Sequence, residues 1–219
     1  MNGFKLRNQE ECNHIINDPA VYLQTSRTGV HYEISGYHTD TCYRFSWAMG
    51  FGDYREVFSR VLIDQGEECD LNTEDIRVLV GTGVDAALLA GTLQHFREFQ
   101  RARLTYVYKD GDRLRLREGS SFEKDEGVLL VHTAGVTYDR VAETINLIFD
   151  STPPGEQPCV QGCMVLFDRS PESSDWRKRF AAFKMVVGIR SPIVPYIADS
   201  FLCPYCVAKM PVINALEAA

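Results

Sequence analysis

An apolar segment that runs into a glycine-containing turn and then into a helix occurs twice in this chain, and this repeat constrains the fold most. Residues 76–80 predict a buried strand, Gly81-Thr82-Gly83 form the turn, and the Ala- and Leu-rich stretch from Val84 to Gln100 predicts a helix. The same order recurs over residues 127–150. Strand–turn–helix units in series predict an α/β protein in which a mostly parallel sheet is flanked by helices on both faces.

The second unit follows an inserted hairpin. Residues 104–109 and 113–117 predict two strands joined by a glycine turn, and the period-two alternation of the second strand places its arginines on one solvated face. Residues 127–150 then predict a strand to Val131, a turn to Tyr138 and a helix. The other predicted elements are helices over 3–17, 54–66 and 176–187 and strands over 30–34 and 163–167.

Length and charge limit the class of protein. The 219 residues predict a single domain, residues 1–219, with one sizeable core. The formal net charge of −7 disfavours nucleic acid as a partner, because the overall field repels polyanions. No stretch approaches the roughly 20 apolar residues of a membrane span, and the first residues lack the apolar run of a secretory signal. We therefore expect a cytoplasmic protein without membrane contact.

The cysteines suggest two different uses. Seven cysteines without a secretory signal predict reduced thiols rather than a disulfide framework. Cys159 and Cys163 form one pair and Cys203 and Cys206 form a second, and four thiolates can hold Zn²⁺ tetrahedrally. The Cys-Pro-Tyr-Cys pair alternatively suits a redox couple. All four can instead be ordinary buried thiols.

The two turns define the candidate site. Ligands of open parallel sheets bind beyond the carboxyl ends of the strands, which here end at Val80 and Val131. His31, His38 and His132 are candidates for lining such a cleft, although a single histidine is as typical of a core or surface position. The sequence contains no Gly-x-Ser-x-Gly segment and no phosphate loop of the NTPase kind. Hydrolase and NTPase activities thus have no motif to support them.

The stretch from Gly127 to Ile145 resembles the phosphoribosyl-diphosphate (PRPP) motif of type I phosphoribosyltransferases. That motif combines an apolar strand, two acids, small residues, a Thr/Gly-rich phosphate loop and a helix that often continues Val-x-Glu-Thr-Ile. The likeness is to the orotate phosphoribosyltransferase-like branch and spans about residues 20–210. It includes Val80-Gly81-Thr82-Gly83, Ala86–Ala90, Tyr106–Lys109, Phe167-Asp168-Arg169, Leu23–Ser26 with Tyr32, and the late Cys-Pro-x-Cys.

This resemblance implies the type I phosphoribosyltransferase fold, with a core over about residues 50–170 and a small hood from the N-terminal and C-terminal segments. It also implies a homodimer, because orotate-type relatives share their active sites between two subunits. The implied ligand is a small phosphorylated or nucleotide-like molecule. The implied ligand-binding residues are Gly81, Thr82, Gly83, Asp85, His132, Thr133, Ala134, Gly135, Val136, Thr137, Tyr138, Asp139 and Arg140.

The chain departs from the motif where the family holds sugar and phosphate. Family members carry two acids that accept hydrogen bonds from the ribose hydroxyls; His132 and Thr133 stand there in this chain, and a neutral imidazole accepts only one hydrogen bond. The phosphate loop carries Tyr138 and Asp139 in place of glycines. We expect Asp139 to cap its own helix and to occupy the N–H groups that a phosphate needs. Asp85 adds a carboxylate at the other helix start.

Two functions therefore compete. The first is a catalytically impaired module whose altered PRPP site binds a nucleotide-like ligand or a protein. The second is an active, divergent transferase that uses Mg²⁺ to condense PRPP with a base, with Lys109 as the catalytic cation and Thr137 at the 5-phosphate. The stretch from Lys109 to Gly119 is short for the mobile lid of the family. A third hypothesis, a zinc-stapled interaction protein, depends on the paired cysteines.

Overall fold

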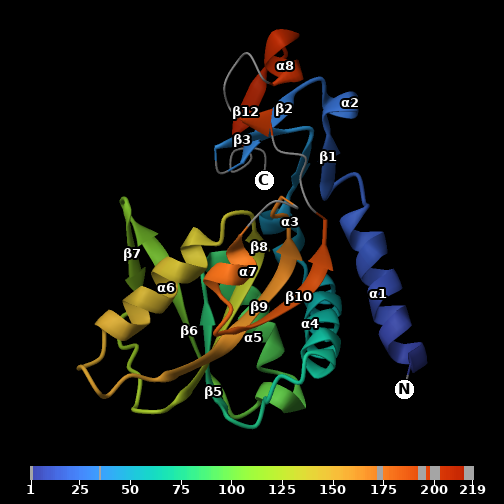
Figure 1. The fold of residues 1–219 in the computed structure, drawn as a ribbon. Coiled ribbons are helices and arrows are strands. Elements are labelled where there is room, and N and C mark those ends of the chain that lie inside the picture. The colour runs from blue at the N-terminus through green and yellow to red at the C-terminus, as the bar shows by residue number, and fades with distance from the viewer. Residues whose placement is uncertain (1, 35, 172–174, 192–195, 198–202, 215–219) are drawn as a thin grey trace.

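A six-stranded sheet forms the centre of the molecule (Figure 1). The computed structural model describes residues 2–34, 36–171, 175–191, 196–197 and 203–214. Its strands lie in the order β10-β9-β8-β5-β6-β7, and every neighbouring pair is parallel except the β6–β7 hairpin. The predicted mostly parallel sheet is confirmed. The strands are β5 (Ile76–Gly81), β6 (Arg103–Asp110), β7 (Arg113–Leu116), β8 (Gly127–Gly135), β9 (Cys159–Asp168) and β10 (Lys184–Arg190).

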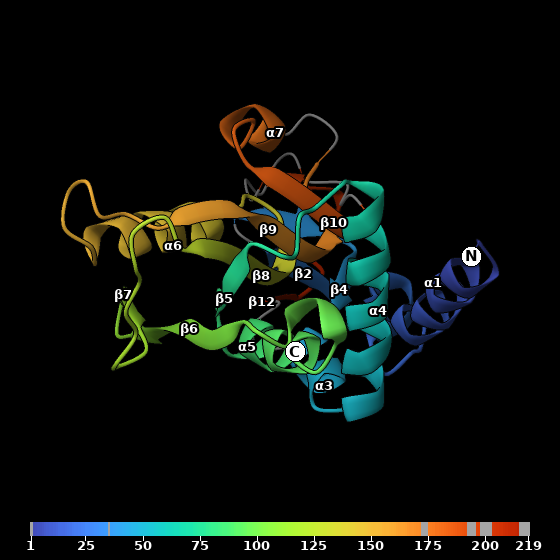
Figure 2. The ribbon, with the colours of Figure 1, turned by 90° about the horizontal axis from the view of Figure 1, so that it is seen from below.

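Helices cover both faces of this sheet (Figure 2). The helices outside the hood are α1 (Asn2–Ile16), α3 (Phe45–Met49), α4 (Gly52–Glu68), α5 (Val84–Leu93), α6 (Asp139–Asp150), α7 (Trp176–Arg179) and the 3₁₀ turn η1 (Arg97–Phe99). Of these, α1 packs on α4, and α3 packs on α4 and α5. Alternate strand residues enter two cores: Leu79 and Leu129 pack with α4 and α5, whereas Val80 and Leu130 pack with α6. Burial on both faces explains why the strands are apolar throughout rather than alternating.

A second, four-stranded sheet combines the two ends of the chain above the central sheet (Figure 1). Its order is β11-β3-β2-β12, and β12 runs parallel to β2 with Val212 opposite His31. We call this sheet, its neighbouring two-stranded sheet and the short helices α2 and α8 the hood. Its elements are β1 (Tyr22–Gln24), α2 (Thr25–Thr28), β2 (His31–Ile34), β3 (Tyr37–Thr39), β4 (Thr41–Tyr43), β11 (Tyr196–Ile197), α8 (Pro204–Val207) and β12 (Val212–Asn214).

Three predicted boundaries were wrong. Helix α5 ends at Leu93 instead of Gln100, because the chain leaves the helix and buries the ring of Phe99 at the end of the 3₁₀ turn η1. The helix predicted over 176–187 is one turn, α7, followed by strand β10. The β-branched, buried run around Val186 pairs with β9, and this pairing overrides the helical pattern.

The third wrong boundary is in the site. Residues 132–138 were expected to form a turn, yet β8 continues to Gly135, which lies opposite Asp168 of β9. Backbone pairing with β9 thus extends the strand through His132 and Thr133. The predicted helices over 3–17 and 54–66 and strands over 30–34 and 163–167 are confirmed within a few residues. None of the described helices is both long enough and apolar enough to cross a membrane.

Candidate functional site

A pocket of about 280 Å³ lies between the hood and the carboxyl ends of the central strands. Asp85 and residues 132–134 and 136–140 line it, so most of the predicted ligand-binding residues surround one cavity. Gly81 ends β5 and Thr82 and Gly83 lead from it into α5. Sequence reasoning missed the other lining residues, which come mainly from the hood and α3: Ile34, Cys42, Tyr43, Phe45, Ser46 and Arg169.

His132 links the two turns. Its ring Nδ1 lies 2.5 Å from the hydroxyl of Thr82, across from β8 to the turn after β5. Thr82 is almost fully buried, and the His132 ring is half-buried. Burial lowers the pKa of His132 to about 4, so the imidazole is neutral at pH 7. A neutral, hydrogen-bonded imidazole therefore stands at one of the two positions where the resembled family has carboxylates, and Thr133 stands at the other.

This pKa predicts how stability depends on pH. The folded-state pKa of about 4 lies below the unfolded value of about 6.5, so between these values only the unfolded state binds the proton. The free energy of unfolding therefore has its full value above pH 6.5. It falls by up to about 3 kcal/mol as the pH drops toward 4, because the proton binds only to unfolded His132. Urea unfolding of the wild type and His132→Gln from pH 7 to pH 4.5 should show a flatter pH dependence for the variant. An equal change in the exposed control His95→Gln would contradict this assignment.

The two carboxylates at the helix starts have side-chain partners. Asp85 accepts a hydrogen bond from the hydroxyl of Ser46 at 2.8 Å. Asp139 accepts one from Arg179 at 2.6 Å, and this bond, helped by one from Thr137, lowers the pKa of Asp139. The expectation that Asp139 caps its own helix was wrong, because it is the first helical residue and its carboxylate turns to Arg179. Both acids remain on the pocket wall.

Tyr138 gives the loop its shape. It precedes α6 with φ 61° and ψ 16°, a left-handed conformation that is uncommon for residues other than glycine. Its ring is buried, and the centroid lies 4.7 Å from that of Trp176. Gly135 lies directly below this ring, since a Cβ there would stand 2.4 Å from a ring carbon. The segment that corresponds to the glycine-rich phosphate loop is thus anchored by an aromatic side chain.

An arginine closes the hood side of the pocket. Arg169 is almost fully buried, and its guanidinium donates to the hydroxyl of Thr41 at 2.7 Å. The same group lies 4.8 Å from the ring centroid of Tyr43, a cation–π distance. Burial lowers the pKa of Arg169, although an arginine still keeps its charge. Two stacked aromatic rings, Tyr43 and Phe45, continue this wall.

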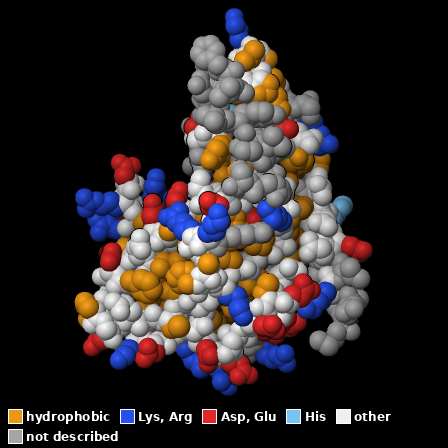
Figure 3. All heavy atoms as spheres, in the orientation of Figure 1, with side chains coloured by type: hydrophobic (Ala, Val, Ile, Leu, Met, Phe, Trp, Pro, Cys, Tyr) orange, Lys and Arg blue, Asp and Glu red, His pale blue; other side chains and the backbone are white. Residues whose placement is uncertain are grey.

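Lys109 lies outside this pocket. It is exposed near the end of the β6–β7 hairpin, and basic side chains gather there in Figure 3. On the same hairpin Arg115 pairs with Asp110 at 2.6 Å, and Arg117 lies over the ring of Tyr106. The expected solvated face of arginines is therefore the arrangement in the structure, and it places no charge on the pocket wall.

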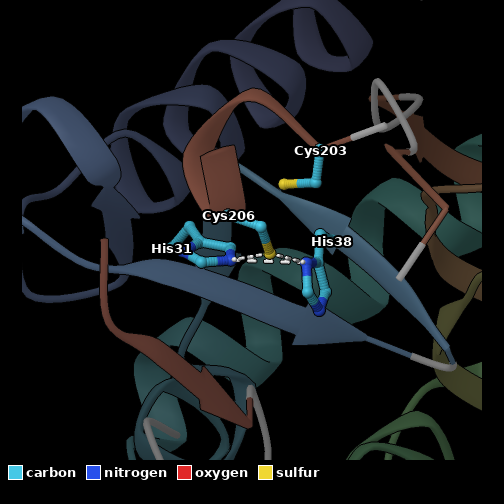
Figure 4. Close-up of side chains that lie close together, drawn as sticks. All are labelled: His31, His38, Cys203 and Cys206. Carbon is cyan, nitrogen blue, oxygen red and sulfur yellow. Dashed lines mark hydrogen bonds between the residues drawn. The ribbon is translucent and has the colours of Figure 1, made fainter. Parts of the chain in front are cut away.

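The structure separates the two cysteine pairs. Cys159 is exposed at the start of β9 and Cys163 is buried within that strand. Cys203 and Cys206 instead lie beside His31 and His38, with all four potential ligand atoms within 4.8 Å of one another (Figure 4). The grouping of four cysteines was therefore wrong. The spacing of the cysteines in the sequence could not show that His31 and His38 of the hood, rather than Cys159 and Cys163, lie beside Cys203 and Cys206.

Comparison with known proteins identifies the fold of this chain. No family model matches the chain. The fold is similar to that of orotate phosphoribosyltransferase from Aeropyrum pernix, with a TM-score of 0.61, 16% identity, and coverage of 81% of this chain and 92% of that one. It is also similar to a phosphoribosyltransferase from Corynebacterium diphtheriae, with a TM-score of 0.57, 14% identity, and coverage of 84% and 96%. The protein therefore has the type I phosphoribosyltransferase fold.

One known protein is also similar to this chain in sequence. The orotate phosphoribosyltransferase of Caldanaerobacter subterraneus subsp. tengcongensis is 26% identical over 180 residues, which cover 82% of this chain and 84% of that protein. The chain is thus similar to orotate phosphoribosyltransferases in both sequence and fold.

Proposed function

We propose that this protein binds a small nucleoside-like molecule in the pocket beneath the hood and does not transfer phosphoribosyl groups. The observation that carries the proposal is the neutral side chain of His132 on the extended strand β8, which is hydrogen-bonded to Thr82 in the turn after β5 and is followed by Thr133. Transfer from PRPP develops positive charge on the sugar, and preorganised negative groups would stabilise it. A neutral imidazole and a threonine hydroxyl supply none.

The phosphate side of the pocket supports the same proposal. A helix N-terminus attracts an anion when its N–H groups are free and its surroundings are neutral or basic. Here Asp85 and Asp139 place carboxylates at both helix starts that line the cavity. Arg179 forms an ion pair with Asp139, and the hydroxyl of Ser46 donates a hydrogen bond to Asp85. Both carboxylates thus have partners already, and their negative charge disfavours a phosphate beside them.

The walls suggest which molecule fits. Tyr43 and Phe45 offer apolar ring faces to a planar base, and Arg169 beside them offers a cation. Asp85 and Thr133 offer acceptors for hydroxyl groups. A nucleoside or a related uncharged heterocycle satisfies these groups better than a polyphosphate does. A homodimer, and Mg²⁺ in an active enzyme, remain predictions from the resemblance.

Calorimetry with Mg²⁺ and PRPP tests this proposal. We expect no PRPP binding by the wild type up to millimolar PRPP, binding of the uncharged nucleoside uridine, and no release of pyrophosphate when PRPP and a base are supplied together. The double variant His132→Asp with Thr133→Asp should gain measurable PRPP affinity, about tenfold or more, because each carboxylate can accept a charge-assisted hydrogen bond. The exposed control His95→Asp should gain none. Micromolar PRPP binding by the wild type, followed by pyrophosphate release with any base, would instead establish the active transferase.

A further inference from the structure

Four side chains from opposite ends of the sequence converge inside the hood. His31 is on β2, His38 on β3, and Cys203 and Cys206 bracket the first turn of α8. Figure 4 shows both rings and both thiols turned toward one point. His31 and Cys203 are fully buried, His38 nearly so, and Cys206 is partly exposed.

From this convergence we propose that the hood binds one zinc ion through His31, His38, Cys203 and Cys206. Zn²⁺ prefers four nitrogen and sulfur ligands in tetrahedral geometry, and two cysteines with two histidines form one of its common structural sites. Two thiolates and two neutral imidazoles around Zn²⁺ give a complex without net charge. Burial of a neutral complex avoids the cost of burying an isolated ion.

The distances fit this geometry. Zinc–nitrogen bonds of about 2.05 Å and zinc–sulfur bonds of about 2.3 Å place tetrahedral ligand atoms about 3.3 Å apart for two nitrogens and about 3.6 Å for sulfur and nitrogen. His31 Nε2 and His38 Nδ1 are 3.3 Å apart. The sulfur of Cys206 lies 3.5 Å from His31 Nε2 and 3.1 Å from His38 Nδ1. No two of the four ligand atoms are more than 4.8 Å apart, so the side chains need to move by only about 1 Å to coordinate one ion.

The surroundings suit a structural rather than a catalytic site. Four protein ligands leave no open position for water or substrate, which is the arrangement of structural zinc. The ring of Tyr205 stacks on that of His31 with centroids 5.6 Å apart, so it covers one side of the group. Cys203 immediately precedes α8 and Cys206 lies within its single turn, so the spacing of one turn brings both thiols to the same side.

Zinc at this point would join the two ends of the chain. The β2–β3 hairpin carries His31 and His38, and it also carries Ile34, which lines the pocket. The cysteines belong to the C-terminal segment, whose strand β12 pairs with β2. The ion would thus hold this segment against the hairpin and fix the roof of the pocket. This role is independent of the chemistry in the pocket.

Metal analysis of the purified full-length chain tests the site. We expect one zinc per chain by mass spectrometry of the metal after purification without chelator. Cys206→Ser and His38→Asn should each lower the zinc content by at least fivefold. Cys69→Ser and Cys159→Ser are matched controls, because both thiols are exposed and outside the group, and they should keep one zinc.

A second measurement needs no variant. Cobalt added to metal-free wild type should produce the intense visible bands of tetrahedral Co²⁺ and the charge-transfer band of its thiolate ligands, and zinc should remove both. Zinc should also raise the melting temperature of metal-free protein by about 5–10 °C. A chain without zinc that gives no cobalt bands, a disulfide between Cys203 and Cys206 in the freshly purified protein, or equal zinc in Cys206→Ser would overturn the proposal.

Discussion

Replacing Asp168 with alanine is expected to lower the free energy of unfolding by about 3–5 kcal/mol, because it breaks a buried charged network. Asp168 ends β9 and is fully buried. Its Oδ1 accepts hydrogen bonds from the backbone N–H and the hydroxyl of Ser170, at 3.0 and 2.6 Å. Arg190 lies 3.8 Å from its other oxygen, and the indole N–H of Trp176 donates to the Ser170 hydroxyl at 2.7 Å. Alanine leaves the buried N–H and hydroxyl of Ser170 without their acceptor and removes the carboxylate that faces Arg190.

Urea unfolding followed by circular dichroism measures this loss. Asp168→Asn keeps an oxygen that can accept from Ser170, so it should cost only about 1–2 kcal/mol. Asp112→Ala, at the exposed turn of the hairpin, should change stability by less than about 0.5 kcal/mol. If Asp168→Ala cost no more than Asp112→Ala, the network would contribute nothing to the fold.

The central sheet could be predicted because its signals are local. Each buried strand is a short apolar run bounded by glycine or charge, and helix α6 occupies the predicted residues, Asp139 to Asp150. The hood could not be predicted in the same way. Its strands have two to four residues, and the pairing of β12 with β2 joins positions about 180 residues apart. Such pairing depends on the finished tertiary structure and leaves no periodic signal in either segment.

The candidate site shows the same division. The turns after β5 and β8 could be located from the order of strand, turn and helix. The turn after β8 lines the pocket, and Asp85, in the first turn of the helix that follows β5, lines it as well. The expected self-cap of Asp139 was wrong because Arg179, 40 residues later, competes for the same carboxylate. The cysteine grouping failed for a similar reason, since His31 and His38 reach Cys203 and Cys206 only through the pairing of the hood. The position of the site could thus be predicted from local sequence patterns, whereas the partners of its side chains come from residues far away in the sequence.

Replacing Tyr138 with glycine is expected to cost about 3–5 kcal/mol of unfolding free energy, since the buried ring is lost from between Gly135 and Trp176. The cost arises from packing rather than from the backbone. Glycine accepts the φ of 61° without strain, so the substitution removes the ring and leaves the turn favourable. Tyr138→Phe keeps the ring and should cost no more than about 1–2 kcal/mol.

A double-mutant cycle isolates the contact itself. Gly135→Ala alone should cost about 1–3 kcal/mol, because its Cβ would stand 2.4 Å from a ring carbon of Tyr138 and the ring has no free space to enter. In the Tyr138→Gly background the same change should cost almost nothing, which gives a coupling energy of about 1–3 kcal/mol in urea unfolding. Gly155→Ala serves as the control: it is exposed with φ 85° and nothing within 4 Å, so its cost arises from the backbone and should be equal in both backgrounds. Additive costs for Gly135→Ala and Tyr138→Gly would mean that the ring does not rest on Gly135, and that the loop before α6 is held by other contacts.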